Sequence, residues 1–158
     1  MPSRNKEVIK RFRYLFAGVV QGVGFRPFIY RLAVRNNLRG FVQNRPEGVL
    51  AEIEGTADAV ESFLSQVREQ LPPQAQITHV SAAEMAARSD DQFRIIDSAA
   101  DGAGNVHIPP EIAVCENCLQ ELFDPADRRY RYPFINCTDC GPRLTIIRAI
   151  PYDRSNTS

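Results

Sequence analysis

All four cysteines of the 158-residue chain lie in one short stretch, as two Cys-x-x-Cys pairs with eighteen residues between them. The cysteines are Cys115, Cys118, Cys137 and Cys140. Two pairs at this spacing are typical of a metal site to which each pair contributes two thiolates. Four thiolates favour tetrahedral Zn²⁺ in a closed and therefore structural site. The alternatives are a redox-active Cys-x-x-Cys pair and buried thiols that bind no metal.

The sequence around the cysteines is rich in proline and shows little hydrophobic periodicity. A module of about fifty residues of this kind buries too little apolar surface to fold well alone, so we expect a metal to stabilise it. The stretch ahead of it is rich in Ala, Gly, Ser and Asp, which is typical of a linker. We predict a domain over residues 1–97, a linker over residues 98–106 and a four-cysteine zinc-finger module over residues 107–158. His79 and His107 are isolated, and we interpret them as surface or packing residues.

The first domain alternates between strand and helix patterns. Phe12, Tyr14 and Phe16 alternate with Arg11 and Arg13, which predicts a half-buried strand. One face of a first helix carries an apolar stripe of Phe25, Ile29, Leu32 and Ala33. Further on, a hairpin turn joins two strands. Thr56 can cap a second helix, whose apolar stripe consists of Val60, Phe63, Leu64, Val67 and Leu71. The predicted strands and helices lie in or near residues 12–20, 25–33, 40–44, 49–54, 56–71, 77–81 and 93–96. This order, starting with strand, helix, strand, strand, helix, strand, predicts an α+β fold, the ferredoxin-like split βαβ sandwich.

Composition and charge narrow the class of protein. Hydrophobic residues make up 44% of the chain and charged residues 24%, as in soluble globular proteins. No apolar run approaches the roughly 18 residues that cross a bilayer, and no signal core follows the N-terminus, so we predict a cytoplasmic protein. The net charge is zero, but residues 1–45 are basic and residues 46–97 acidic. The basic half either attracts anions or is simply one of two solvated faces, and the second interpretation is the simpler one.

A glycine-rich loop lies where the first strand meets the first helix. Its residues are Gln21, Gly22, Val23, Gly24, Phe25 and Arg26. Glycines let successive N–H groups point inward, and the helix N-terminus adds unsatisfied donors, so the loop is predicted to bind an anion. Arg26 offers a planar fork of donors that matches phosphate. The alternative is a tight turn beside a surface arginine. Asn44 ends a strand that we expect to neighbour the first strand and to face this loop.

Two motifs resemble the paired signature of the acylphosphatases. The first runs from Gly18 to Arg26 and the second from Gly40 to Val49, and the resemblance covers about residues 10–97. It implies that Arg26 binds the phosphoryl group, that Asn44 positions the attacking water, and that the backbone of residues 21–25 cradles the phosphate. No covalent nucleophile is then needed, because positioning and charge stabilisation supply the rate.

The stretch from Cys115 to Ser158 is similar to the first zinc finger of HypF, the carbamoyltransferases of hydrogenase maturation. In that family an acylphosphatase-like domain precedes this finger and hydrolyses carbamoyl phosphate. Later domains adenylate the carbamate and pass it to a cysteine of a partner protein, from which a cyanide ligand of nickel–iron hydrogenase is made. The resemblance implies a fragment that lacks the second finger and the adenylation and transferase domains.

Three hypotheses follow. The first is an acylphosphatase-type hydrolase acting on carbamoyl phosphate, and the second a non-catalytic module that binds phosphate and interacts with other proteins through its zinc finger. The third is nucleic-acid binding, which we place last because acidic residues offset the arginines of the finger and no basic stripe emerges.

Overall fold

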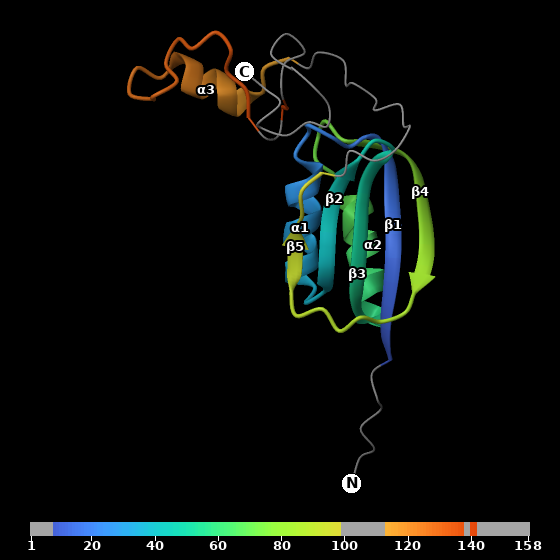
Figure 1. The fold of residues 1–158 in the computed structure, drawn as a ribbon. Helices are drawn as coiled ribbons and strands as arrows, with labels where there is room; N and C mark the ends of the chain where they lie inside the picture. Colours follow the sequence, from blue (N-terminus) through green and yellow to red (C-terminus); the bar gives the residue numbers. More distant parts are fainter. Residues whose placement is uncertain (1–7, 99–112, 138–139, 142–158) are drawn as a thin grey trace.

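The computed structural model describes residues 8–98, 113–137 and 140–141 (Figure 1). Its elements are β1 (Ile9–Val19), α1 (Phe25–Arg35), β2 (Arg39–Arg45), β3 (Gly48–Thr56), α2 (Ala57–Glu69), β4 (Gln76–Met85), β5 (Phe93–Ile95) and α3 (Glu116–Phe123). No helix in the described ranges is long and apolar enough to cross a membrane. The predicted linker beyond Ser98, His107 and the chain after Gly141 lie outside the described residues.

The five strands form one sheet in the order β4-β1-β3-β2-β5, and α1 and α2 cover the same face of it (Figure 1). This confirms the ferredoxin-like α+β sandwich. The expectation that the strand of Asn44 neighbours the first strand is wrong, because β3 lies between β1 and β2. Both β1 and β2 run antiparallel to β3 and therefore parallel to each other. Their C-terminal ends thus meet the same edge of the sheet, and Asn44 lies at the edge where the glycine-rich loop begins.

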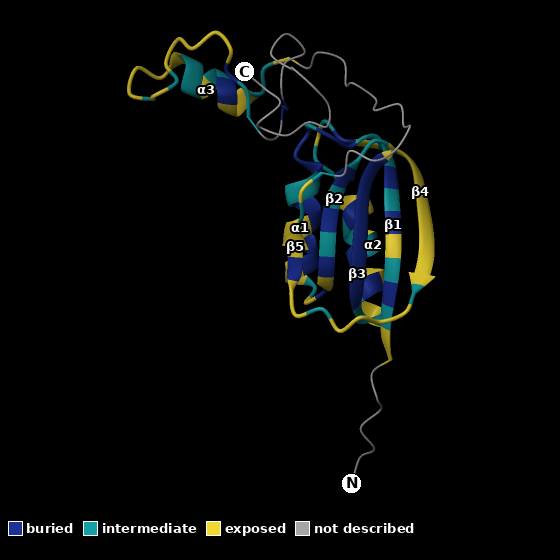
Figure 2. Cartoon of the chain, viewed as in Figure 1, coloured by how far each residue is buried: buried dark blue, intermediate teal, exposed yellow. Residues whose placement is uncertain are grey.

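The core lies between the sheet and the two helices (Figure 2). On β1, Tyr14 and Phe16 point into it, and Phe16 meets Phe25 of α1 edge to face, with 5.4 Å between the ring centroids. The apolar stripe of α1 is buried as predicted, with Phe28 added to it. Thr56 caps α2 by accepting a hydrogen bond from the Ala59 N–H at 3.2 Å, also as predicted. In the stripe of α2, Val60, Phe63 and Val67 are buried, whereas Leu64 and Leu71 are only partly buried.

Strand β4 is longer than its hydrophobic pattern predicts. The pattern supports residues 77–81, but the pairing of β4 with β1 continues to Met85, which lies opposite Arg11. The added residues 82–84 are exposed. Backbone pairing to a neighbouring strand, rather than burial of side chains, therefore extends β4.

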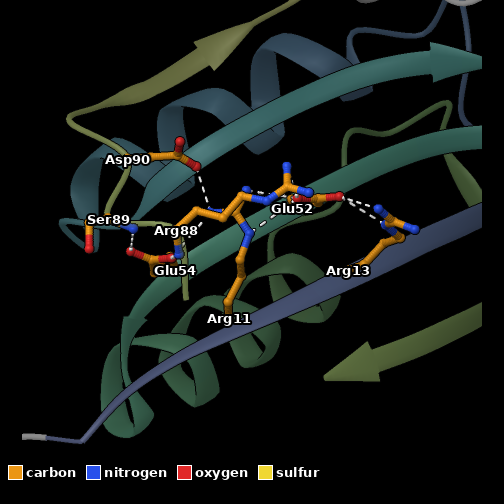
Figure 3. Close-up of polar contacts among 7 residues, drawn as sticks. All are labelled: Arg11, Arg13, Glu52, Glu54, Arg88, Ser89 and Asp90. Carbon is orange, nitrogen blue, oxygen red and sulfur yellow. Dashed lines mark hydrogen bonds and ion pairs between the residues drawn. The ribbon is translucent and has the colours of Figure 1, made fainter. Parts of the chain in front are cut away.

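A network of charged side chains covers the other face of the sheet (Figure 3). Arg11 is 1% exposed and donates to Glu52 at 2.7 Å, to Glu54 at 3.2 Å and to Asp90 at 2.5 Å. Arg13 donates to the second oxygen of Glu52 at 2.6 Å. Arg11 of the basic segment therefore belongs neither to a free positive field nor to a solvated face. Pairing of β1 with β3 places their opposite charges side by side.

Glu54 uses the same network to hold the connection between β4 and β5. Its two carboxylate oxygens accept the backbone N–H groups of Arg88 at 2.6 Å and Ser89 at 2.9 Å. Asp90, from the same connection, reaches Arg11 (Figure 3). These hydrogen bonds therefore fix the connection between β4 and β5 over the buried guanidinium of Arg11.

Glu52 makes stability depend on pH. Its burial alone would raise its pKa, but the hydrogen bonds from Arg11 and Arg13 outweigh this and lower the pKa below the ordinary value of 4.5. A carboxylate with a lowered folded-state pKa stabilises the fold fully above that ordinary value, and the stabilisation is lost as the pH falls through the lowered pKa. We expect Glu52→Gln to lower the free energy of unfolding by about 3 kcal/mol at pH 7, because it leaves two arginines poorly compensated. The difference from the wild type should shrink below pH 4.5.

Urea unfolding followed by far-UV circular dichroism at pH 7 and at pH 3.5 measures this difference. Glu84→Gln is the matched control, because Glu84 is exposed and lies 4.0 Å from Lys10 in a surface pair. Such a pair contributes less than about 1 kcal/mol. A Glu52→Gln effect that is equal at both pH values would contradict the assignment.

Candidate active site and metal centre

The glycine-rich loop joins β1 to α1, and of residues 21–25 only Gly22 is partly exposed. Gly22 and Gly24 have left-handed backbones with φ of 73° and 75°, and Gly24 is the N-cap of α1. The side chain of Val23 is fully buried beneath them. No backbone carbonyl of the described residues accepts the N–H groups of Gly22, Val23 or Gly24. The loop therefore offers these donors beside a helix N-terminus, which is the arrangement that binds anions.

Gln21 contributes its side chain as well as its backbone. Its Nε2 donates to the carbonyl of Arg45 at 2.6 Å and to the carbonyl of Gly48 at 3.0 Å. These bonds tie the loop to the hairpin between β2 and β3, next to Asn44. The sequence motif indicated only the backbone of residue 21, because the hairpin that its amide reaches is more than twenty residues further along the chain.

Asn44 is 2% exposed, and its Oδ1 is buried without a donor among the described residues. The Oε1 of Gln21 is in the same state. A buried acceptor without a partner costs about 1–3 kcal/mol, so we expect a water or a bound group to supply the donor. The Nε2 of Gln21 bonds the carbonyl of Arg45, which directly follows Asn44, so the loop is tied to the hairpin next to Asn44.

Arg26 is the second residue of α1 and is partly buried. Its Nη1 donates to the Oγ of Ser98 at 3.3 Å, and Gln43 donates to the carbonyl of Asp97 at 2.7 Å. The chain after β5 is thus held between α1 and the end of β2, and it links Arg26 to the edge that carries Asn44. Sequence analysis missed Ser98, since its only signal was a composition typical of a linker. The catalytic roles of Arg26 and Asn44 stay predictions.

The four predicted cysteines come together in one cluster whose Sγ atoms all lie within 4.8 Å of one another. Three separations are 3.5 Å for Cys115 to Cys137, 3.8 Å for Cys118 to Cys140 and 3.7 Å for Cys137 to Cys140. Metal–sulfur bonds of about 2.3 Å in a tetrahedron give sulfur–sulfur distances of about 3.8 Å. The cluster therefore fits a metal ion, whereas a disulfide needs about 2.05 Å.

The surroundings of two of the thiols shift their pKa values in opposite directions. Burial raises the pKa of Cys118. Burial has the same tendency at Cys140, but hydrogen bonds from the backbone of Cys137 and Cys115 outweigh it and lower that pKa to about 7. A thiolate is the form that binds metal, and of these two thiols it is Cys140 whose surroundings favour the thiolate.

Arg129 supports the metal-binding cluster from outside it. It pairs with Glu121 of α3 and donates to the carbonyl of Asn136 at 2.8 Å. These contacts join the helix that follows Cys115 to the chain that leads into Cys137. Sequence analysis did not single out Arg129, because nothing local distinguishes it from the neighbouring arginines.

Known protein families match both the sheet domain and the cysteine-containing module of this chain. The family model "Acylphosphatase" matches residues 12–95, and "HypF finger" matches residues 114–147. The acylphosphatase of Thermotoga petrophila is 36% identical over 88 residues, which cover 55% of this chain and 97% of that protein. The chain belongs to the acylphosphatase family over this domain.

The relatives that match both parts are carbamoyltransferases. Carbamoyltransferase HypF2 of Cupriavidus necator is 48% identical over 157 residues, which cover 98% of this chain and 19% of that protein. A crystal structure of full-length HypF in the phosphate- and nucleotide-bound form has a TM-score of 0.87 at 42% identity, over 98% of this chain and 20% of that one. The chain combines an acylphosphatase domain with the HypF finger, and it spans about one fifth of the length of these HypF relatives.

Proposed function

We propose that this chain hydrolyses an acyl phosphate, carbamoyl phosphate, as the first step of carbamoyl transfer in the maturation of nickel–iron hydrogenase. The observation that carries the proposal is the group of loop N–H donors beside the buried, unpartnered Oδ1 of Asn44. Such a pair of features suits a phosphoryl group together with a water. The choice of acyl group is supported by the HypF relatives, whose name states carbamoyl transfer.

In the proposed reaction, Arg26 and the N–H groups of residues 21–25 bind the phosphoryl oxygens. The Oδ1 of Asn44 accepts a hydrogen bond from a water and aims its oxygen at phosphorus. The new P–O bond forms as the bond between phosphorus and the carbamoyl oxygen breaks, so carbamate leaves and the water's protons stay on dihydrogen phosphate. Arg26 and the loop stabilise the charge on the equatorial oxygens, where fixed donors contribute most to the rate.

The metal module has a structural role in this proposal. Cys115, Cys118, Cys137 and Cys140 would hold one Zn²⁺, which supplies folding energy and takes no part in the hydrolysis. The proposed boundaries stay residues 1–97 for the hydrolase domain, 98–106 for the linker and 107–158 for the finger. In a full-length relative, further domains would adenylate the carbamate and transfer it to an acceptor cysteine of a partner protein.

Asn44→Ala tests the role of the amide. We expect kcat for carbamoyl phosphate to fall about 100-fold with little change in KM, because a misplaced water costs this much while Arg26 still binds the phosphoryl group. Phosphate release measures both constants, and Asn117→Ala, at an exposed position in the finger, is the matched control.

The free energy of unfolding of Asn44→Ala should stay near that of the wild type, because removal of an unpartnered buried oxygen offsets the packing lost with this buried side chain. A kcat within twofold of the wild type would contradict the assignment of Asn44. A wild type that binds phosphate but turns over neither carbamoyl nor acetyl phosphate would instead favour the non-catalytic binding and interaction module.

A further inference from the structure

Gly141 of the metal module touches the glycine-rich loop of the acylphosphatase domain. It follows Cys140 directly and is buried, with a left-handed backbone of φ 72°. Its Cα faces the carbonyl oxygen of Gly22, and a Cβ built at Gly141 would overlap that oxygen far inside van der Waals contact. Only a glycine allows the two backbones to approach in this way.

The contact between Gly141 and Gly22 affects the direction of the next N–H group in the loop, that of Val23. A trans peptide is planar, so the carbonyl of Gly22 and the N–H of Val23 point in opposite directions. With the carbonyl directed at Gly141, the Val23 N–H points away from the metal module. Rotation of this peptide is otherwise easy, because a glycine precedes it. Gly141 therefore favours one orientation of a donor that the loop presents to an anion.

The position of Gly141 depends in turn on the cysteines. Its N–H donates to the carbonyl of Cys137 at 2.9 Å, which closes the turn of the second Cys-x-x-Cys pair. Cys140 is 1% exposed, and its Sγ lies 3.8 Å from that of Cys118. A metal would hold four thiolates at these distances, since without one they repel one another. Loss of the metal should therefore release Gly141 from the loop.

We infer that the metal site and the phosphate loop are energetically coupled: the metal-loaded cysteine cluster places Gly141 against Gly22 and thereby raises the affinity of the loop for phosphate. Gly141 is a positioning residue, since it acts through Gly22 and not on the substrate. The inference rests on the proposed function of the loop and adds that the finger is required for its full affinity.

The first experiment titrates inorganic phosphate into the whole chain by calorimetry, once loaded with Zn²⁺ and once after chelation, with metal content checked in each sample. We expect the Kd for phosphate to rise at least about fivefold without metal, the lower end of ordinary coupling between two sites. Coupling is reciprocal, so saturating phosphate must raise the affinity for Zn²⁺ by the same factor. Competition with a chromophoric chelator measures this second change without any enzyme assay.

The second experiment compares Gly141→Ala with Gly55→Ala, both loaded with Zn²⁺. Gly55 pairs with Lys10 at the far end of the sheet, where a Cβ would meet the side chains of Leu38 and Ala59 and no backbone atom. We expect Gly141→Ala alone to weaken phosphate binding at least about fivefold. Unchanged phosphate affinity in Gly141→Ala, with or without its metal, overturns the inference, as does equal phosphate affinity of the loaded and chelated wild type. Absence of phosphate binding by the loaded wild type would instead remove the proposed function of the loop itself.

Discussion

Arg26→Ala is expected to lower kcat/KM for carbamoyl phosphate about 1000-fold, the largest effect of any single substitution in the domain. Removing one preorganised donor to a developing oxyanion typically costs 10²–10³ in rate, and Arg26 offers a charged fork of several donors. Arg26→Lys should recover part of the loss, because it restores the charge without the planar fork. Phosphate release under steady-state conditions gives the three values.

Arg31→Ala is the matched control for this change. Arg31 lies on the same helix α1 and is exposed, so its loss removes an equal charge without touching the loop. We expect its kcat/KM to stay within about twofold of the wild type, since one exposed charge mainly changes a screened long-range field. An Arg26→Ala variant that keeps a tenth of the wild-type activity would exclude Arg26 as the main phosphate-binding residue.

Cys118→Ser is expected to abolish stoichiometric metal binding and to unfold the metal module. Cys118 is fully buried, and its Sγ is one of the four that the cluster brings together. Structural Zn²⁺ contributes about 10–16 kcal/mol to the folding of small zinc modules, far more than a module of this size gains from its own core. Asn117→Ser, at an exposed position in the same turn, should keep its metal.

Elemental analysis of freshly purified protein measures the metal, and amide hydrogen exchange locates the unfolding. Exchange should accelerate across α3 and its flanking turns while the sheet core keeps its protection, because acylphosphatases of similar length to residues 12–95 consist of this domain alone. Wild-type protein with much less than one metal per chain, or a Cys118→Ser variant that keeps it, would refute the metal assignment. A metal other than zinc would correct only its identity.

The predictions that the structure confirms depend on residues close together in the sequence. The alternation from Phe12 to Phe16, the stripe of α1 and the cap at Thr56 each depend on residues a few positions apart, and the structure confirms them. The order of strands was harder to anticipate. No residue within β2, the strand of Asn44, indicates that β3 lies between β2 and β1. The prediction that β2 neighbours β1 was therefore wrong, although Asn44 does lie at the edge of the sheet where the glycine-rich loop begins.

The charged residues likewise show a difference between what the sequence indicated and what the structure shows. Composition described Arg11 as part of a basic segment, yet it is among the most buried side chains of the domain, since β3 and the β4–β5 connection supply its carboxylates. Burial of a charge depends on partners that are 41 to 79 residues away in sequence. No charge count along the chain can represent such a pairing.

The sequence by itself determined the chemistry that short segments carry: a glycine-rich loop with Arg26, and two cysteine pairs whose spacing fits one metal site. Backbone freedom and ligand spacing are properties of neighbouring residues, so they can be recognised before the chain is folded. Only the tertiary structure decided which distant groups meet these segments. Ser98 reaches Arg26, Gln21 reaches the hairpin, and Gly141 lies against Gly22. Such contacts arise because burying the core brings together surfaces that the order of residues leaves apart.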